Sequence, residues 1–187
     1  MSETSTLPSN REWFRRLLSG RPHQIIGGSD DPYMLRWYVI PRNPVLNVYL
    51  HKFLRSDDDR ALHDHPWWFV SLILKGGYTE VTGAGRTPRS GLVGGRYRGW
   101  DRTLVFRPAT FRHRVELWPV VEHSKPFLGR RDRRELPCWT LIVTGPRRRL
   151  WGFWCPSGRG KVDYPVRDGD RFVPWTEFGD AGCGELP

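Results

Sequence analysis

Short apolar segments separated by turn sequences are the feature that most constrains how this chain folds. Val, Ile, Tyr, Phe and Trp, which favour strands, are concentrated in segments of five to ten residues. Turn sequences such as "IPRNP", "KGG" and "TGPR" divide the segments, and the 20 Gly and 16 Pro interrupt any long helix. Eight or more strands with one terminal helix predict an all-β barrel or jelly roll. The strand-length segments are 33–40, 45–54, 67–74, 78–82, 103–107, 113–118, 138–145 and 150–155.

One helix is expected near the N-terminus, over residues 9–20. Ser9 and Glu12 have the spacing of a capping box, in which each side chain accepts a hydrogen bond from the other residue's backbone N–H. A glycine at position 20 is a natural end for the helix. We expect the helix to pack on the body through an apolar stripe made by Trp13, Leu17 and Leu18.

The length of 187 residues suits a single domain, which we assign to 1–187. Within it we expect a barrel over 33–155, with a long hairpin loop over 83–99. Residues 156–187 are expected to form a polar loop followed by a docked aromatic segment over 172–179. The exposed edges of such a sandwich leave homodimer formation open.

The net charge of +10 comes mostly from arginine, which is concentrated at 129–135 and 146–150. Clustered arginine can bind phosphate backbones. Both clusters, however, lie between predicted strands, where exposed loops belong, and no nucleic-acid-binding motif accompanies them. We therefore expect solvated loops rather than a nucleic-acid site, although the role of the two clusters stays open.

Three cysteines and the absence of long apolar runs bear on location. Cys138, Cys155 and Cys183 are irregularly spaced, and we expect buried or incidental thiols rather than a disulfide framework. No run reaches the roughly 18 uncharged apolar residues that a membrane-spanning helix needs. The first residues also lack the basic-then-apolar order of a secretory signal. These features predict a cytoplasmic protein with no membrane partner.

The segment "HDHPWWFVSLILKGGYTEV" carries the first chemical signal, at residues 63–81. Residues two apart on a strand face the same side, about 7 Å from each other, so His63 and His65 can converge on one metal ion. If the strand continues, the same inward face carries residues that line a pocket. These residues are Trp67, Phe69 and Ser71.

A third histidine follows in "FRPATFRHRVELW". Apolar residues alternate with charged ones after His113, and we expect the charged face, with Arg114 and Glu116, to be in water. His113 then lies on the inward apolar face. A lone inward histidine is more often a hydrogen-bonded core residue, but three of them, two in His-x-His spacing, predict a metal site.

Two motifs of the chain resemble those of the cupin superfamily. The first is the pair His63 and His65 at the start of a buried strand, with a glycine turn after the strand. The second is "RPATFRH", in which Pro108 stands five residues before His113. The second motif of the family reads Pro-x-Gly-x-x-His, and Thr110 takes the place of its glycine. The "HDHPWWFVSLIL" string also resembles small uncharacterised cupins of phage and bacterial genomes.

The resemblance spans about residues 45–120 and implies a double-stranded β-helix, the jelly-roll barrel of cupins, over most of 33–155. Cupins commonly add a Glu ligand four or five residues after the second histidine, where this chain has Phe69 and Val70. A three-His site is similar to that of thiol dioxygenases of the cysteine dioxygenase type, which bind Fe(II). Glu80 on the next strand can supply a carboxylate instead, although a solvent-facing or outer-shell position fits its spacing better.

The resemblance therefore implies one divalent transition metal, with Fe(II) favoured and Zn, Mn or Ni as alternatives. Three neutral imidazoles leave the metal its full charge, which favours a small anionic substrate such as a thiol or keto acid. Two other functions stay open: a cupin sugar isomerase or epimerase, and a non-catalytic ligand-binding cupin. Further candidates are His51 and Tyr49 as catalytic or pocket-lining residues, and, more weakly, Arg36 and Arg55 as partners of a substrate carboxylate.

Overall fold

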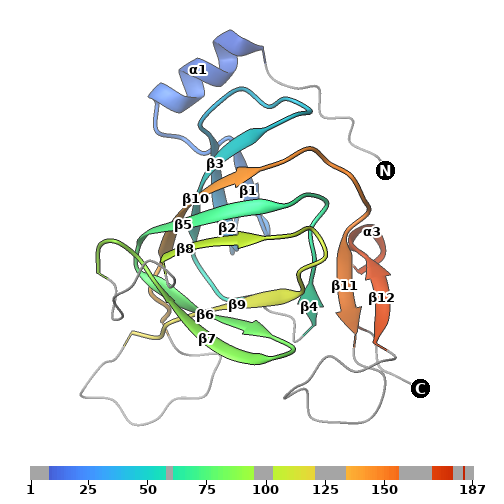
Figure 1. Cartoon of the computed structure of the whole chain (residues 1–187). Helices are drawn as coiled ribbons and strands as arrows, with labels where there is room; N and C mark the ends of the chain where they lie inside the picture. The colour runs from blue at the N-terminus through green and yellow to red at the C-terminus, as the bar shows by residue number, and fades with distance from the viewer. Residues whose placement is uncertain are drawn as a thin grey trace.

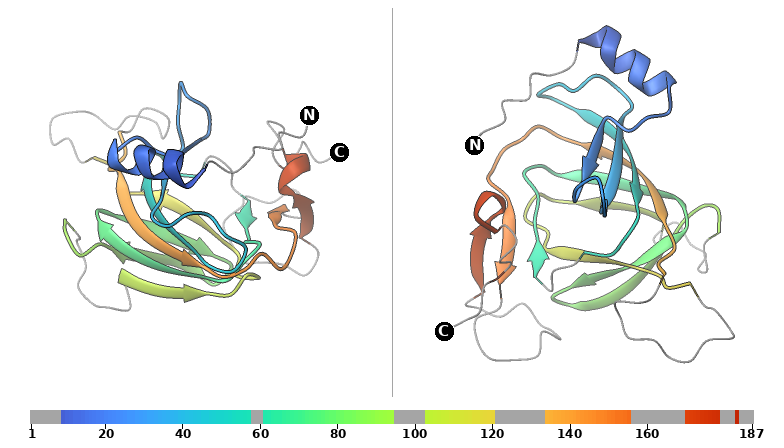
Figure 2. Two further views of the ribbon diagram at one scale, coloured as in Figure 1. Left: turned by 90° about the horizontal axis from the view of Figure 1, so that it is seen from above. Right: turned by 180° about the vertical axis from the view of Figure 1, so that it is seen from behind.

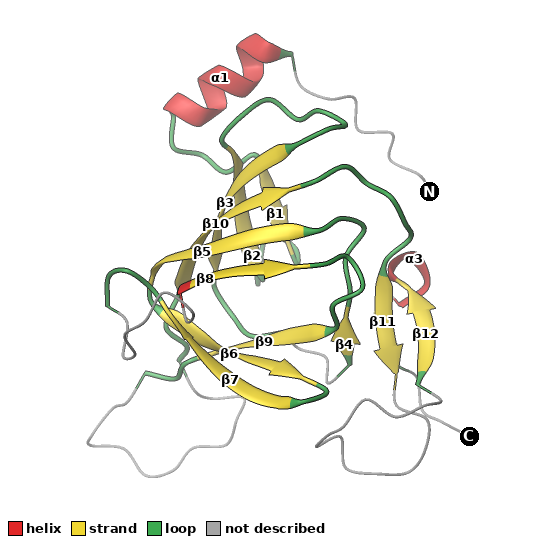
Figure 3. Ribbon diagram, in the orientation of Figure 1, coloured by secondary structure: helices red, strands yellow, loops and turns green. Residues whose placement is uncertain are grey.

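Strands dominate the computed structural model, which describes residues 9–57, 61–94, 103–120, 134–155, 170–178 and 183 (Figure 3). The helices are α1 (Asn10–Leu18) and the one-turn α3 (Trp175–Phe178). The predicted all-β class with a short N-terminal helix is therefore confirmed. The strands are β1 (Gln24–Ile26), β2 (Met34–Tyr38), β3 (Asn47–Phe53), β4 (Leu62–His63), β5 (Phe69–Lys75), β6 (Gly77–Thr82), β7 (Gly85–Ser90), β8 (Leu104–Arg107), β9 (His113–Leu117), β10 (Cys138–Thr144), β11 (Gly152–Cys155) and β12 (Arg171–Pro174).

The strands form two antiparallel sheets (Figure 1). The first sheet has the order β1-β2-β3-β10-β5-β8, and the second has the order β12-β11-β4-β9-β6-β7. The strands from β3 to β6 alternate between the two sheets along the chain. The strands from β7 to β10 then pair with these four, which gives the four-strand sets β3-β10-β5-β8 and β4-β9-β6-β7. This interleaving is the strand order of a jelly roll.

Two local assignments differ from the sequence prediction. The histidine pair does not begin the strand that carries Phe69: His63 ends β4 in the second sheet, and the chain then crosses to β5 in the first. Pro66 lies in this crossing, where a missing backbone N–H interrupts no ladder. The predicted loop over 83–99 is also wrong in part, because its residues 85–90 form β7 and pair with β6. Residues 95–99 lie outside the described part.

The inner faces of the sheets enclose both the apolar core and a cavity. On β5 the alternation places Phe69, Ser71 and Ile73 inward and buried. Ile73 belongs to a buried cluster that lies away from His113, near the C-terminal ends of β5 and β9. The cluster consists of Ile73, Tyr78, Val115, Leu117 and Cys138. Burying such side chains stabilises the fold by about 1.5–3 kcal/mol each, so this half of the sandwich holds the two sheets together.

The outward face of β9 is buried, contrary to the expectation that its charges lie in water. Arg114 is 5% exposed and Glu116 is 8% exposed. The two side chains form an ion pair of 2.8 Å between Nη2 and Oε1, and Arg86 also donates to Glu116. The ion pairs offset the free-energy cost of removing these charges from water. The alternating pattern of the sequence does not show that the charged residues pair with each other, which is why the prediction for this face was wrong.

Helix α1 lies at one end of the molecule, beyond β3 (Figure 1). Its capping box forms as predicted, with the Ser9 backbone N–H donating to Glu12 Oε2 at 2.9 Å. The Trp13 indole donates to the carbonyl of Tyr38 at 2.8 Å and so attaches the helix to β2. Leu18, expected in the packed stripe, is 72% exposed, whereas Trp13 and Leu17 of that stripe are partly buried.

At one side of the molecule, β11 and β12 extend the second sheet beyond β4, and α3 lies next to them (Figures 1 and 2). Cys155 and Cys183 form a disulfide with a Cα–Cα distance of 5.4 Å, so the expectation of unpaired thiols is wrong for these two residues. Only Cys138 is a free, buried thiol, as expected. Most of the predicted polar loop, residues 156–169, lies outside the described residues. Among the described helices, none is long and apolar enough to cross a membrane.

Candidate metal centre

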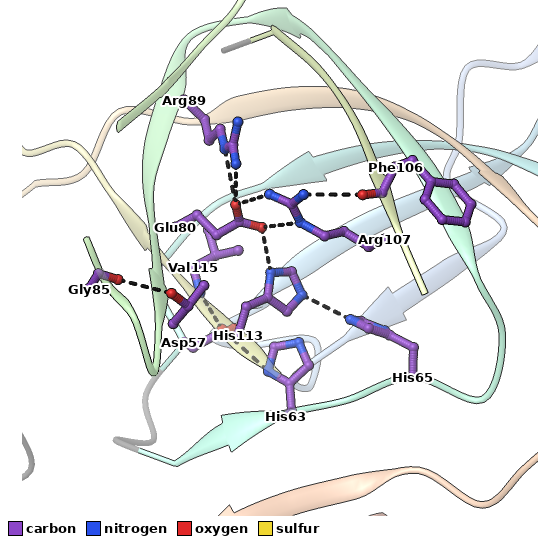
Figure 4. Close-up of polar contacts among 11 residues, drawn as sticks. Asp57, His63, His65, Glu80, Gly85, Arg89, Phe106, Arg107, His113 and Val115 are labelled. Atoms are coloured by element: carbon purple, nitrogen blue, oxygen red, sulfur yellow. Dashed lines mark hydrogen bonds and ion pairs between the residues drawn. The ribbon is translucent and has the colours of Figure 1, made fainter. Parts of the chain in front are cut away.

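Three histidines meet at the inner face of the second sheet, two from its strands and His65 from the crossing after β4 (Figure 4). His63 on β4 is the cross-strand partner of His113 on β9, so the two side chains face the same way. His65 is held next to them because its backbone N–H donates to the carbonyl of Ala109 at 3.0 Å. The ring centroids of the three histidines lie 4.9–5.1 Å from one another.

The donor atoms of this cluster fit one metal ion. One ring nitrogen from each of His63, His65 and His113 lies within 4.8 Å of the others. Two imidazole nitrogens that each lie about 2.1 Å from one ion can be at most about 4.2 Å apart. Small shifts of the side chains are therefore enough to bring all three nitrogens within reach of one ion. Nε2 of His65 and Nε2 of His113 are already only 2.9 Å apart. Three imidazoles without a thiolate suit iron, zinc, nickel or copper.

Burial keeps His63 and His65 in the protonation state that binds metal. Burial lowers the pKa of His63 to about 4, although the nearby Asp57 opposes the shift. Burial also lowers the pKa of His65 well below its ordinary value, and the neighbouring His113 adds to the effect. Neutral imidazole is the form that binds metal, so these two histidines need no proton release at neutral pH.

Glu80 stands directly behind His113 (Figure 4). Its Oε1 lies 3.0 Å from Nδ1 of His113, which leaves Nε2 of the ring directed at the cluster. Glu80 is 1% exposed, so a solvent-facing position is wrong. Since the carboxylate faces the far side of the ring, it orients a ligand and is not a fourth member of the cluster.

Two arginines balance the charge of Glu80. Arg89 donates to Oε2 from Nη2 at 2.7 Å, and Arg107 donates to Oε1 from Nε at 3.2 Å. Burial alone raises the pKa of Glu80, but hydrogen bonds from His113 and Arg107 hold it below the ordinary value. The carboxylate is therefore ionised, and the metal centre gains no net negative charge from this group.

Asp57 supports His63 in a similar way and was not anticipated from the sequence. Its Oδ2 lies 3.6 Å from Nδ1 of His63 and accepts the backbone N–H of Val115 at 2.6 Å. Tyr33 donates its hydroxyl to the other oxygen of Asp57. The residue lies in the acidic run "SDDDR", in which no periodicity distinguishes one aspartate from the next.

Asp64, between the two histidines, fixes the position of the His-x-His segment. It is 1% exposed and accepts hydrogen bonds from the backbone N–H of Gly152 and the indole of Trp154, both at 3.0 Å. Arg149 donates to the same carboxylate at 2.6 Å. At least one arginine of the 146–150 cluster thus has a structural role, whereas positions 129–133 of the other cluster lie outside the described residues.

A cavity of about 1060 Å³ lies between the sheets, with the three histidines on one wall. Phe69, at a position where cupins commonly carry the Glu ligand, packs its ring 4.7 Å from that of His65. Besides the three-His cluster, the lining includes these candidates of the sequence analysis: Arg36, Tyr49, His51, Arg55, Trp67, Phe69 and Ser71. Glu80 is the one candidate that is not among the lining residues. Their roles toward a ligand stay predictions.

The jelly-roll strand order and the inward histidines of β4 and β9 agree with the two motifs of the sequence. The fold is that of a cupin. No family model and no curated protein sequence matches this chain.

Similar solved structures include KdgF from Halomonas sp., with 14% identity, 66% of this chain and 94% of that chain covered, and a TM-score of 0.41. EutQ from Clostridium difficile has 9% identity, with 69% and 79% covered and a TM-score of 0.41. The polyketide cyclase RemF from Streptomyces resistomycificus has 13% identity, with 60% and 65% covered and a TM-score of 0.39. These likenesses bring no activity to this chain.

Proposed function

We propose that this cupin is an Fe(II)-dependent dioxygenase acting on a small anionic substrate such as a thiol or a keto acid. The observation that carries the proposal is a donor set of three imidazoles with no carboxylate among them, on the wall of a cavity. His63, His65 and His113 hold one divalent transition metal in this proposal. Zn, Mn and Ni are the alternatives to iron.

When bound, the metal supplies a Lewis-acidic and redox-active centre with coordination positions that the protein leaves open. The residues around it have separate tasks. Glu80 and Asp57 orient the rings of two of the histidines, and the charge of Glu80 is offset by arginine. The aromatic rings of Phe69 and Trp67 line the cavity and exclude water from the ligand. An anionic substrate is favoured because no ligand carboxylate neutralises the metal.

Oxygen consumption tests the proposal directly. Protein reconstituted with Fe(II) under anaerobic conditions is mixed with air-saturated buffer and a panel of thiols and keto acids. The wild type is expected to consume oxygen with at least one of them, and His63→Ala is expected to lose both iron and activity. His23→Gln, which changes a histidine outside the cavity, serves as the control. Stoichiometric iron without oxygen uptake on any substrate would remove the dioxygenase function and leave the metal site.

A sugar isomerase or epimerase is the second candidate, and a pair of tryptophan rings in the cavity lining favours it. Trp151 and Trp175 stack with centroids 5.8 Å apart and planes at 6°, and both line the cavity. Flat aromatic faces with polar edges suit sugar rings, and His51 is placed to act as an acid or base. Activity that prefers zinc, or persists without metal, supports this candidate. Failure to bind any metal after reconstitution supports a non-catalytic ligand-binding cupin.

Two further properties, the oligomeric state and the location, are also proposed. The edge strand β8 exposes Leu104 and Phe106, at 45% and 59%, which supports a homodimer formed along this edge. A cytoplasmic location stays a prediction, and the Cys155–Cys183 disulfide weighs against it, because disulfides are rare in reducing compartments.

A further inference from the structure

Four polar residues form a row across the inner face of the first sheet. Gln24 is the cross-strand partner of Arg36, Arg36 of His51, and His51 of Thr140. Directly opposed residues on neighbouring strands face the same side, so all four side chains point the same way. All four line the cavity, on the wall formed by the sheet that does not carry the histidine cluster. We call them the polar row.

The guanidinium of Arg36 is the only charge of the polar row. Its Nε donates to Nε2 of His51 at 2.9 Å, and its Nη1 donates to Oε1 of Gln24 at 3.1 Å. These contacts use two of its five N–H groups, and both partners are neutral. In the described part of the chain no carboxylate forms an ion pair with Arg36, and its charge acts across the cavity on His65, whose pKa it helps to lower. A half-buried guanidinium with free donors is prepared for an oxyanion.

His51 is fixed as a hydrogen-bond donor by the same contact. Since its Nε2 accepts the N–H of Arg36, the neutral ring carries its proton on Nδ1. Burial lowers the pKa of His51 well below its ordinary value, so the neutral form prevails. The Nδ1–H therefore adds a donor beside the guanidinium.

Thr140 ends the row with a buried hydroxyl that has no partner within the described structure. The residue is 1% exposed, and its Oγ1 makes no hydrogen bond there. Leaving a buried hydroxyl unpaired costs stability, and native structures rarely accept that cost without a reason. Because Thr140 lines the cavity, this hydroxyl is available to a ligand there.

We propose that the polar row binds the carboxylate or phosphate group of the substrate, while the other end of the same molecule reaches the three-His cluster on the opposite wall. Only the contact with the three-His cluster rests on the proposed function, and anion binding at the polar row does not. It assigns a substrate with two separated polar ends. The cavity of about 1060 Å³ has room for such a molecule, since pockets for ligands of drug size are about 300–1,000 Å³.

The test uses metal-free protein, so that binding at the polar row is measured apart from the metal. Inorganic phosphate and succinate are titrated separately into the wild type, followed by nuclear magnetic resonance shifts of the His51 ring. Saturable binding of at least one anion is expected, and the two titrations distinguish a phosphate from a carboxylate group. Arg36→Gln is expected to weaken that binding about 10- to 100-fold, from the loss of charge-assisted hydrogen bonds. Arg147→Gln removes an equal charge at an exposed position and is expected to bind as the wild type does.

Thr140→Val keeps the proposal testable if Arg36→Gln fails to fold. The substitution removes only the unpaired hydroxyl, so the melting temperature of the metal-free protein is expected to stay equal or to rise by about 2–4 °C. Anion binding is expected to weaken about 2- to 10-fold. A purely structural threonine would leave the anion affinity unchanged, and that result would count against the proposal.

The outcomes separate this proposal from the proposed function. Anion binding that depends on Arg36, in a protein that binds no metal, supports the polar row and removes the metal-dependent function. A bound metal with no anion binding, or with equal loss in Arg36→Gln and Arg147→Gln, overturns the polar row and leaves the metal function standing.

Discussion

Replacing Glu80 with glutamine tests whether a carboxylate behind His113 prepares the metal site. The side chain is 2% exposed and lies against Arg89, 11% exposed, and Arg107, 15% exposed. Glutamine keeps the shape but leaves both guanidiniums facing a neutral amide. Removing one partner of a buried ion pair typically costs about 3–5 kcal/mol, which we expect as the loss in free energy of unfolding. Because the amide is a weaker acceptor for Nδ1–H of His113, metal affinity should fall about 10- to 100-fold.

The assay measures stability and metal affinity separately. Guanidinium unfolding of the metal-free protein gives the stability, and competition with a chelator for zinc gives the affinity. Glu116→Gln is the matched control, because Glu116 is also buried in an arginine network of the second sheet, with Arg86 and Arg114. Its ion-pair partners Arg86 and Arg114 are not histidines of the cluster. We expect Glu116→Gln to lose stability and to keep the zinc affinity of the wild type.

The comparison of the two variants decides the question. Equal zinc affinity in Glu80→Gln and wild type would refute the role of Glu80 in orienting His113, whatever the change in stability. A fall in affinity in both variants would point to general loosening of the sheet rather than to the contact with His113.

Three further predictions follow from the same contacts. Reduction of the disulfide, or Cys183→Ser, should lower the free energy of unfolding by about 3.5 kcal/mol, from the loop entropy of a 28-residue separation between Cys155 and Cys183, as measured by urea unfolding with and without reductant. Metal-free protein should lose stability as the pH falls from 6.5 to about 4, because His63 has a pKa of about 4 when folded and 6.5 when unfolded, so the unfolded chain binds the extra proton. The stabilisation is complete above pH 6.5, and the loss from this group reaches about 3 kcal/mol. His63→Gln should remove the share of this group from the slope, whereas His51 and His65, whose pKa values burial also lowers, keep theirs. Asp64→Asn should weaken the contact with Arg149 and lower zinc affinity by releasing the His-x-His segment, whereas unchanged affinity would show that the backbone alone holds the segment.

The metal cluster was predictable because its signals are local. The spacing of His63 and His65, and the alternation after His113, each follow from strand geometry within a few residues. Three inward histidines, two of them in His-x-His spacing, predicted a shared metal site, and the resemblance to cupins supported it, although no spacing in one chain shows which strands are neighbours. The structure places these two segments on adjacent strands.

The support around the cluster was not predictable, because it depends on pairs far apart in the chain. Glu80 and His113 are 33 residues apart, and Asp64 and Arg149 are 85 apart. The sequence pattern also misplaced the charges of β9, since an arginine that is paired with a buried glutamate looks the same in sequence as one in water. The disulfide likewise depends on how β11 and the C-terminal segment meet.

The central claim is that His63, His65 and His113 bind one metal ion. Elemental analysis after anaerobic reconstitution with iron, followed by desalting, measures this most directly. We predict about one iron per chain in the wild type and none in His113→Ala, with both proteins folded by circular dichroism. A wild type that retains no iron, zinc, manganese or nickel, or a His113→Ala variant that retains as much metal as the wild type, would contradict the account.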